Sequence, residues 1–270
     1  MHIHLPLYDW LLLFIIALQG VSIRVISRHW NSYRRAKREE GRGKPWVLPR
    51  MPLDALDPVF AVPTPGLGHA TTTEVAFIST GQTSMVGVPS DYESWILAVL
   101  AQRASSMFEF GTCTGRTTYL WARNSPSTAK IHTITLHPES LDKYREGAGD
   151  NPEDRADALQ ESTFQKFVYS GTDVESKVEQ LYGDSKAFDH NPFKGCCDLI
   201  FVDGSHAQSY VESDSAKALQ MLKPRGIILW HDYRGPHRSG GVFHALNALG
   251  TKLPLMQIEG TSLVAYRGPG

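Results

Sequence analysis

From residue 90 onward, short apolar runs alternate with longer segments in which hydrophobic residues recur at helical spacing. The runs "SMFEF", "KIHTITL", "CDLIFVDG" and "GIILWHDY" have the length and the β-branched and aromatic content of buried strands. The segment "SYVESDSAKALQMLKP" has the pattern of an amphipathic helix that Pro224 ends. Strands that alternate with helices predict a mostly parallel sheet covered on both faces.

Two local signals mark the ends of this region. Ser90, with Glu93 three residues later, has the pattern of a capping box and predicts that a helix begins there. The C-terminal "LMQIEGTSLVAYR" predicts a hairpin that turns at Glu259 and Gly260 and adds an antiparallel strand. We therefore expect an α/β fold built on an open, doubly wound sheet.

The N-terminal pattern is different. In "YDWLLLFIIALQGVSIRVIS" no charged residue lies between Asp9 and Arg24, and the apolar stretch approaches the roughly 20 residues that cross a bilayer. We predict a transmembrane helix in residues 1–30. A helix that lies on the membrane surface, or one packed against the protein's own body, remains an alternative.

Charge supports the membrane prediction and gives it an orientation. The 270 residues have a formal net charge of -1, yet residues 1–50 hold nine Lys and Arg and only three Asp and Glu. By the positive-inside rule, the basic side stays in the cytoplasm. We expect a single-pass membrane protein with a cytoplasmic C-terminal domain, an anionic lipid surface as the partner of the basic segment, and no nucleic-acid partner.

The chain therefore divides into three predicted segments. They are the membrane helix (1–30), a basic and Pro/Gly-rich connector (31–89) and the α/β domain (90–270). The polar stretch 139–178 is expected to be a surface excursion or, alternatively, a lid or docking surface. Cys113, Cys196 and Cys197 have neither a disulfide-framework nor a metal-type spacing.

Polar residues gather where the predicted strands end. They are Glu109 to Gly115, Asp184, Asp203 and the pair His231 and Asp232. In open α/β sheets, ligands bind at the carboxyl ends of the strands. Gly111 and Gly115 permit a tight turn, and the helix that follows offers free N–H groups. This combination predicts a nucleotide-type binding site.

Four motifs in this region resemble those of class I S-adenosylmethionine-dependent methyltransferases, in particular the bacterial small O-methyltransferase-like proteins. They are "EFGTCTGRTT", "YGDS", "DLIFVDGSH" and "KPRGIILWHDY". The resemblance covers about residues 90–267 and implies a Rossmann-like, seven-stranded sheet with S-adenosylmethionine as cofactor. It also implies the cofactor-binding residues, which are Glu109, Gly111, Thr112 and Gly115 on the methionine and ribose side, Thr135 at the ribose, Asp184 and Ser185 at the adenine, and Asp203 near the sulfonium.

The resemblance also suggests a metal and a base. Asp203, His231 and Asp232 match positions that bind a divalent cation in some metal-dependent relatives. Carboxylate ligands suit Mg²⁺, whereas imidazole favours softer metals. His206 and His231 are the candidate catalytic bases, because imidazole titrates near neutral pH. Alternatively, His206 is a loop histidine hydrogen-bonded to a neighbouring acid.

One position departs from the family pattern. The acid that usually follows the second strand and binds both ribose hydroxyls is replaced by Thr135. The loss of charge-assisted hydrogen bonds costs up to a few kcal/mol of cofactor affinity, at roughly 1.5–3 kcal/mol each.

Two functions are therefore open. The first is a membrane-anchored methyltransferase that acts on an oxygen of a small or membrane-associated acceptor. The second is a non-catalytic accessory subunit of a membrane protein complex, docked through residues 1–45.

Overall fold

The structure, a computed structural model, describes residues 47–81 and 86–270. The predicted membrane helix and most of the basic segment lie outside the described residues. Within the described ranges, no helix combines the length and the hydrophobicity that a membrane crossing needs.

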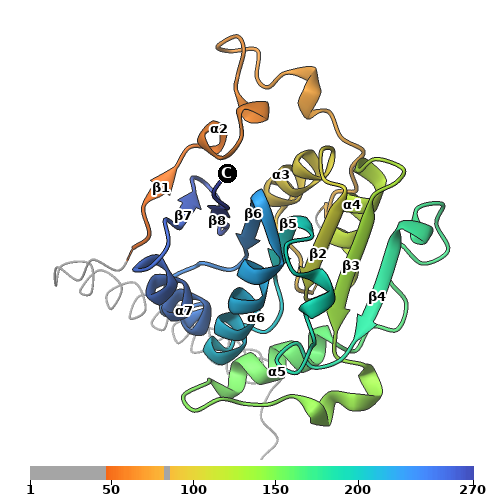
Figure 1. Cartoon of the computed structure of the whole chain (residues 1–270), viewed down its shortest axis with the longest axis vertical. Coiled ribbons are helices and arrows are strands. Elements are labelled where there is room, and N and C mark those ends of the chain that lie inside the picture. Colours follow the sequence, from red (N-terminus) through yellow and green to blue (C-terminus); the bar gives the residue numbers. More distant parts are fainter. Residues whose placement is uncertain (1–46, 82–85) are drawn as a thin grey trace, which may run out of the picture. The chain divides into compact units, whose positions relative to one another are not determined.

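The centre of the domain is a single mixed sheet of eight strands (Figure 1). The strands are β1 (Arg50–Met51), β2 (Ser106–Phe110), β3 (Lys130–Thr135), β4 (Val178–Tyr182), β5 (Cys197–Val202), β6 (Leu222–Trp230), β7 (Met256–Ile258) and β8 (Val264–Arg267). Their order is β1-β7-β8-β6-β5-β2-β3-β4, and β8 alone runs against the others. The mostly parallel sheet and the C-terminal hairpin are confirmed.

The predicted count of seven strands is wrong by one. β1 lies in the segment predicted as a connector and pairs in parallel with β7, with Arg50 opposite Gln257. Leu48 is buried, and its N–H donates to the Tyr233 hydroxyl at 3.1 Å. Residues 47–270 form one compact unit, so the domain includes more of the chain than the periodic pattern indicates.

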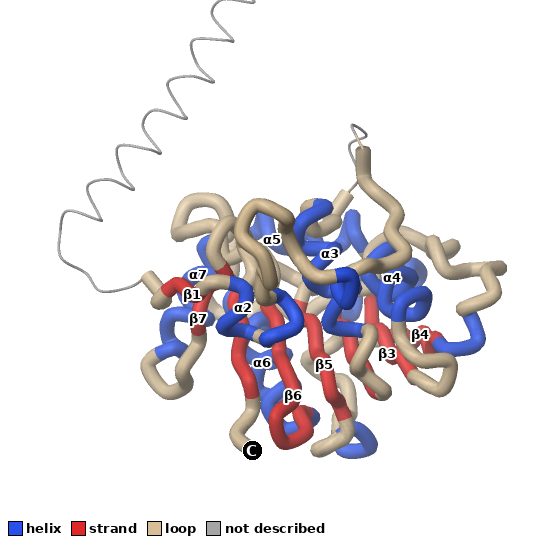
Figure 2. Tube along the Cα trace, turned by 90° about the horizontal axis from the view of Figure 1, so that it is seen from above, coloured by secondary structure: helices blue, strands red, loops and turns tan. Residues whose placement is uncertain are grey.

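Helices cover both faces of the sheet (Figures 1 and 2). They are α2 (Leu53–Leu56), α3 (Asp91–Ala101), α4 (Arg116–Asn124), α5 (Pro152–Glu161), α6 (Gln208–Met221) and α7 (Gly240–Gly250), with 3₁₀ turns at Pro58–Phe60, Thr71–Thr73, Pro138–Lys143, Glu175–Lys177 and Asn191–Phe193. The strand residues alternate between two cores, since Met107 packs with α2, α3 and α4, whereas Phe108 packs with α6 and α7.

The capping box at the start of α3 is confirmed, and it also joins distant parts of the chain. The Ser90 hydroxyl accepts from the Glu93 N–H, and the Glu93 carboxylate accepts from the Ser90 N–H at 2.9 Å. The second oxygen of Glu93 accepts from the N–H and the hydroxyl of Ser262, at 2.7 and 2.8 Å. Glu93 therefore fixes the start of α3 against the turn between β7 and β8.

Close contact between β2 and β5 sets the position of the glycine turn. The Asp203 N–H donates to the Phe110 carbonyl at 2.9 Å. Gly111 has a φ of +97°, and a Cβ there would lie 2.1 Å from the Asp203 carbonyl oxygen. A side chain at residue 111 would thus push the two strand ends apart.

We predict that Gly111→Ala lowers the free energy of unfolding by several kcal/mol, since it combines a strained φ with a backbone clash. Gly171→Ala is the matched control, because Gly171 has a φ of +76° with no atom within 4 Å of an added Cβ. The control should lose only about 1 kcal/mol. Urea unfolding of both variants measures the difference, and equal losses would contradict the close contact.

Candidate functional site

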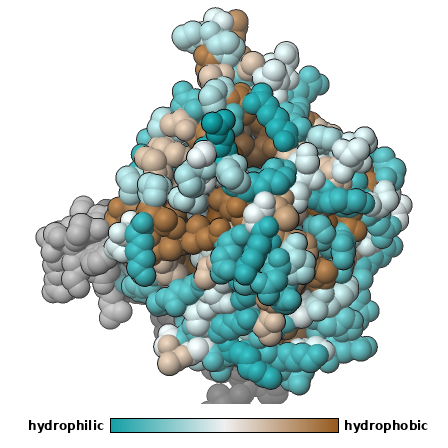
Figure 3. Space-filling view, viewed as in Figure 1, coloured by the Kyte–Doolittle hydropathy of each residue, from teal (hydrophilic) through white to brown (hydrophobic). Residues whose placement is uncertain are grey.

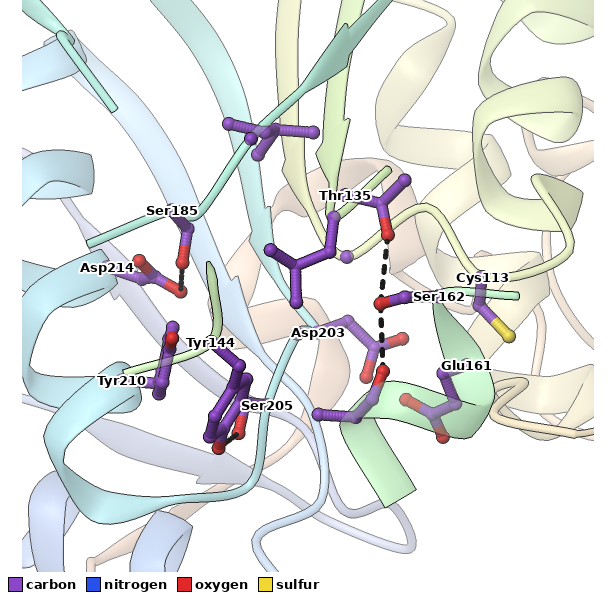
Figure 4. Close-up of a pocket in the computed structure, with 16 residues that line it drawn as sticks. Cys113, Thr135, Tyr144, Glu161, Ser162, Ser185, Asp203, Ser205, Tyr210 and Asp214 are labelled. Carbon is purple, nitrogen blue, oxygen red and sulfur yellow. Dashed lines mark hydrogen bonds between the residues drawn. The ribbon is translucent and has the colours of Figure 1, made fainter. Parts of the chain in front are cut away.

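A cavity lies at the carboxyl edge of the sheet, where α5 and α6 approach the ends of β2, β3 and β5 (Figure 4). Four of the predicted site residues line it, namely Gly111, Thr135, Ser185 and Asp203. The lining also includes residues that the sequence analysis did not assign to the site: Cys113, Tyr144, Glu161, Ser162, Tyr210 and Asp214. The cavity is partly open to solvent, and its volume of about 50 Å³ has room for a few waters, at roughly 10–15 Å³ each.

The glycine turn bends sharply above β2. Cys113 has a φ of +44°, which is uncommon for a residue with a side chain. The Gly115 N–H donates to the Thr112 carbonyl at 2.7 Å and closes the turn. A Cβ at Gly115 would lie 2.8 Å from atoms of Phe167 and Tyr169, so Gly115 faces this aromatic segment.

Two predicted cofactor residues lie beneath the turn and do not line the cavity. Glu109 is buried and accepts hydrogen bonds from the hydroxyls of Thr118 and of Thr133, the latter at 2.7 Å. Burial raises the pKa of Glu109 to about 8. The Thr112 hydroxyl is 2.8 Å from that of Thr133. Both residues therefore stabilise the turn through Thr133 and do not reach the cavity.

The ribose and adenine positions of the resemblance lie at the ends of β3 and β4. Thr135 ends β3, and its hydroxyl donates to the Ser162 hydroxyl at 3.4 Å. Asp184 is buried beside the cavity and accepts from the Lys186 N–H at 2.9 Å. Ser185 lines the cavity and donates to Asp214 at 3.1 Å.

Two imidazoles and three carboxylates form a buried network at the ends of β5 and β6. His231 Nδ1 lies 2.8 Å from Asp203 and 3.4 Å from Asp232, and its Nε2 lies 3.4 Å from Glu93. His206 Nε2 lies 2.6 Å from Asp232. The network brings the predicted metal and catalytic residues together.

The network favours protonated imidazoles. Burial opposes a charge on His206, but the hydrogen bond to Asp232 outweighs it and raises the pKa of His206 to about 9. In the same way, burial is outweighed by Asp203, which holds the pKa of His231 well above its usual value. At neutral pH both rings are therefore in the cationic, doubly protonated form. This form fits the alternative in which His206 is hydrogen-bonded to a neighbouring acid better than it fits a free catalytic base.

The same residues have the chemistry of a cation site. Asp203, His231 and Asp232 each offer one ligand atom, and these atoms lie within 4.8 Å of one another. His231 would have to release its proton before Nδ1 could bind a metal. These three residues could therefore bind a divalent cation only if the cation displaced the proton from His231.

Glu161 is the most informative residue that the sequence analysis missed. It ends α5, lines the cavity beside Cys113 and receives no hydrogen bond from the described residues. Burial raises its pKa to about 7. A signal was present, because Asn151 followed by Pro152 is a typical helix start, and the Asn151 side chain does accept from the Glu153 N–H at 3.1 Å. Part of the expected surface excursion therefore covers the site.

Arg116 was also missed. It follows the glycine turn directly, is 2% exposed, and donates to the carbonyls of Ile78 and Pro89 at 2.7 and 3.3 Å. It also pairs with Asp91 at 2.9 Å. Arg116 thus ties the segment before α3 to the turn.

Residues 108–233 match the model of a family described as a methyltransferase domain. The matched range contains the glycine turn, the cavity and the network of Asp203, His206, His231 and Asp232. The match supports the resemblance to class I methyltransferases for this part of the chain. No curated protein matches the chain in sequence.

Solved structures resemble this chain less clearly than the family model does. The O-methyltransferase TomG from Streptomyces achromogenes, in complex with S-adenosylmethionine, is 17% identical with a TM-score of 0.46 over 67% of this chain and 82% of its own. The methyltransferase PaMTH1 from Podospora anserina, bound to S-adenosylhomocysteine, is 18% identical with a TM-score of 0.48 over 68% and 80%. These values are too low to carry an argument about residues.

The buried Glu109 predicts a measurable pH dependence. Its pKa of about 8 lies above the ordinary value of 4.5, so the folded state binds a proton that the unfolded state has released, and the stability it contributes falls as pH rises from about 5 to 8. Glu109→Gln keeps the shape and removes this titration. The variant should gain roughly 2–4 kcal/mol over the wild type between pH 5 and pH 8.

Denaturant unfolding at several pH values tests this prediction. Glu74→Gln, at an exposed position, is the control and should follow the wild type at every pH. A stability difference between Glu109→Gln and wild type that does not change with pH would show that Glu109 titrates normally.

Proposed function

We propose that the protein is an S-adenosylmethionine-dependent methyltransferase that transfers a methyl group to an oxygen of a small or membrane-associated acceptor. This proposal rests on the cavity beside Gly111, which is lined by three acids: Glu161 of α5, Asp214 of α6 and Asp203 directly after β5. Buried carboxyl groups with few partners favour a cationic ligand. S-adenosylmethionine carries a sulfonium and an ammonium group, and the family match supports this choice.

The residues that would hold the cofactor follow the length of the cavity. Ser185 and Asp214 lie at one end, Thr135 in the middle, and Cys113 and Glu161 at the other (Figure 4). We assign these three parts to the adenine, the ribose and the methionine.

The cofactor supplies an electrophilic methyl group, and the chain must supply a base and an orientation for the acceptor. Glu161 has the pKa that suits a base at neutral pH, and its carboxylate is free to accept the proton of an acceptor hydroxyl. His206 and His231 hold Asp232 and Asp203 in place. Asp203, His231 and Asp232 would hold a divalent cation if His231 released its proton, and the cation would supply Lewis-acid activation of the acceptor oxygen. No observation on the described residues favours the accessory-subunit alternative.

Cofactor binding is the direct test. By isothermal titration, the wild type should bind S-adenosylmethionine more tightly than the neutral thioether S-adenosylhomocysteine, because the carboxylates attract the sulfonium. Glu161→Gln should weaken S-adenosylmethionine binding several-fold and change S-adenosylhomocysteine binding little. Glu153→Gln, exposed on the same helix, is the matched control. A folded protein that binds neither compound at millimolar concentration would exclude the proposed function.

We also propose that residues 1–30 anchor the protein in a membrane, with the domain on the cytoplasmic side. The apolar run and the basic residues that follow it support this proposal. The loop between the first two 3₁₀ turns projects from the domain and carries exposed Val62 and Leu67 (Figures 1 and 3). Such a hydrophobic loop suits a domain held close to a lipid surface.

Fractionation without detergent tests the anchor. The full chain should sediment with membranes and resist extraction by salt and carbonate, whereas a variant that lacks residues 1–30 should stay in the supernatant. The variant retains the compact unit 47–270 and should keep its thermal unfolding transition. Release of the full chain by salt alone would indicate a surface association in place of a span.

A further inference from the structure

A short turn in the loop between the first two 3₁₀ turns presents Leu67 to solvent. The Leu67 N–H donates to the Thr64 carbonyl at 3.1 Å, and Thr64 also forms an antiparallel bridge with Gly68. Pro65 fixes φ at about −65° in the second position, and Gly66 has a φ of +85° in the third. These features define a type II turn. Leu67 is 82% exposed, more than any other large hydrophobic side chain of the described residues.

The base of this loop is closed by specific contacts with α3. His69 Nδ1 donates to the Phe60 carbonyl at 2.9 Å and joins the two ends of the loop. The centroid of the His69 ring lies 4.9 Å from that of Trp95, and Trp95 Nε1 donates to the Thr73 carbonyl at 3.1 Å. Residues 61–69 are nevertheless all exposed. The closed base therefore carries an apolar tip that covers little of the domain.

The segment that contains the turn is uncharged. Residues 58–73 include no Lys, Arg, Asp or Glu, and His69 is their one ionisable side chain. The chain also exposes most of its hydrophobic side chains in and just after this segment. Six of the eight large hydrophobic side chains that are exposed among the described residues are Val62, Leu67, Phe77, Ile78, Val86 and Tyr92. The tip can therefore enter a hydrocarbon layer without burying a charge.

The length of the chain before the domain keeps a bilayer within reach of this tip. Residues 1–30 are the proposed anchor, and the 16 residues from 31 to 46 span at most about 55 Å, at roughly 3.3–3.6 Å each. The compact unit of residues 47–270 has an expected radius of gyration of about 17 Å. The tip can therefore reach the lipid surface, where burial of its apolar side chains is favourable.

We propose that the turn of residues 64–67 inserts Leu67 into the membrane and thereby fixes the orientation of the domain at the lipid surface. This inference rests on the proposed membrane anchor and adds a second point of contact to it. Because the segment has no basic residue, the contact depends on apolar area and not on anionic headgroups. It differs in this respect from the basic residues that follow the apolar run, whose attraction to anionic lipids is screened by salt.

A fluorescent probe at the tip tests the proposal in the full chain. Leu67→Cys takes a thiol-reactive fluorophore in a Cys196→Ser background, because Cys113 and Cys197 are buried. The protein is reconstituted into phosphatidylcholine vesicles with or without lipids that carry a nitroxide quencher near the headgroup end of the acyl chain. The probe at residue 67 should lose about half of its fluorescence or more, because an interfacial side chain lies roughly 5–10 Å deep, at the level of this quencher.

A probe on the other face of the sheet is the matched control. Glu212→Cys, in the same background, places the fluorophore at an exposed position on α6, which packs on the opposite face of the sheet from α3. Its fluorescence should change little. Quenching at residue 67 should also persist at about 1 M salt, where the Debye length is about 3 Å.

Flotation of the same vesicles separates this inference from the proposed anchor. If the chain floats with the vesicles but residue 67 is not quenched, the anchor stands and the inference is wrong. Quenching that disappears at high salt, or that is equal at residues 67 and 212, would equally contradict insertion of the turn. A blue shift at residue 67 without quenching by the nitroxide lipids would indicate a protein contact in its place. If the chain does not float, the anchor and this inference fail together.

Discussion

The close contact between the ends of β2 and β5 is the constraint on which the site depends. The Asp203 N–H binds the Phe110 carbonyl at 2.9 Å, and the Asp203 carbonyl occupies the space that a side chain at residue 111 would need. This contact places the glycine turn beside the carboxyl end of the neighbouring strand. Asp203 thereby reaches both the cavity and His231, and a wider spacing of the two strands would separate the cavity from the charged network.

The charges at this edge are balanced within the chain. Two imidazoles lie among Glu93, Asp203 and Asp232, at distances of 2.6 to 3.4 Å. The Arg234 guanidinium lies 2.7 Å from Asp232, so three cationic groups face three carboxylates. Glu109, in contrast, is held neutral by burial at pH 7. Two acids that line the cavity have few partners, since Glu161 receives no hydrogen bond from the described residues and Asp214 accepts one from Ser185. The charges of the buried network are thus compensated within the chain, whereas the acids of the cavity keep few partners, and a cationic ligand would complement them.

The sequence predicts the parallel sheet, the hairpin and the capping box, because each depends on a local pattern or on the alternation of strands and helices. β1 escaped prediction since two residues show no period, and its pairing with β7 depends on contacts more than 200 positions away. The helix that Pro224 was expected to end stops at Met221, and β6 begins at Leu222. Glu161 and Asp214 escaped because their role depends on which helix face the sheet edge meets. The cofactor motif locates Ser185, but no motif indicates that Asp214 lies beside it.

The position of β8 has a consequence for the order in which the sheet is built. β8 is the last strand in the chain, yet it lies between β6 and β7, and β7 pairs otherwise only with the two-residue β1. During synthesis, the edge of β6 therefore stays open until Val264–Arg267 have left the ribosome, and β1 waits for a partner made some 200 residues later. Ser262, which binds Glu93 at the start of α3, arrives at the same late moment. A chain that ends before Ser262 would leave one edge of β6 unpaired and Glu93 without the two hydrogen bonds that Ser262 donates.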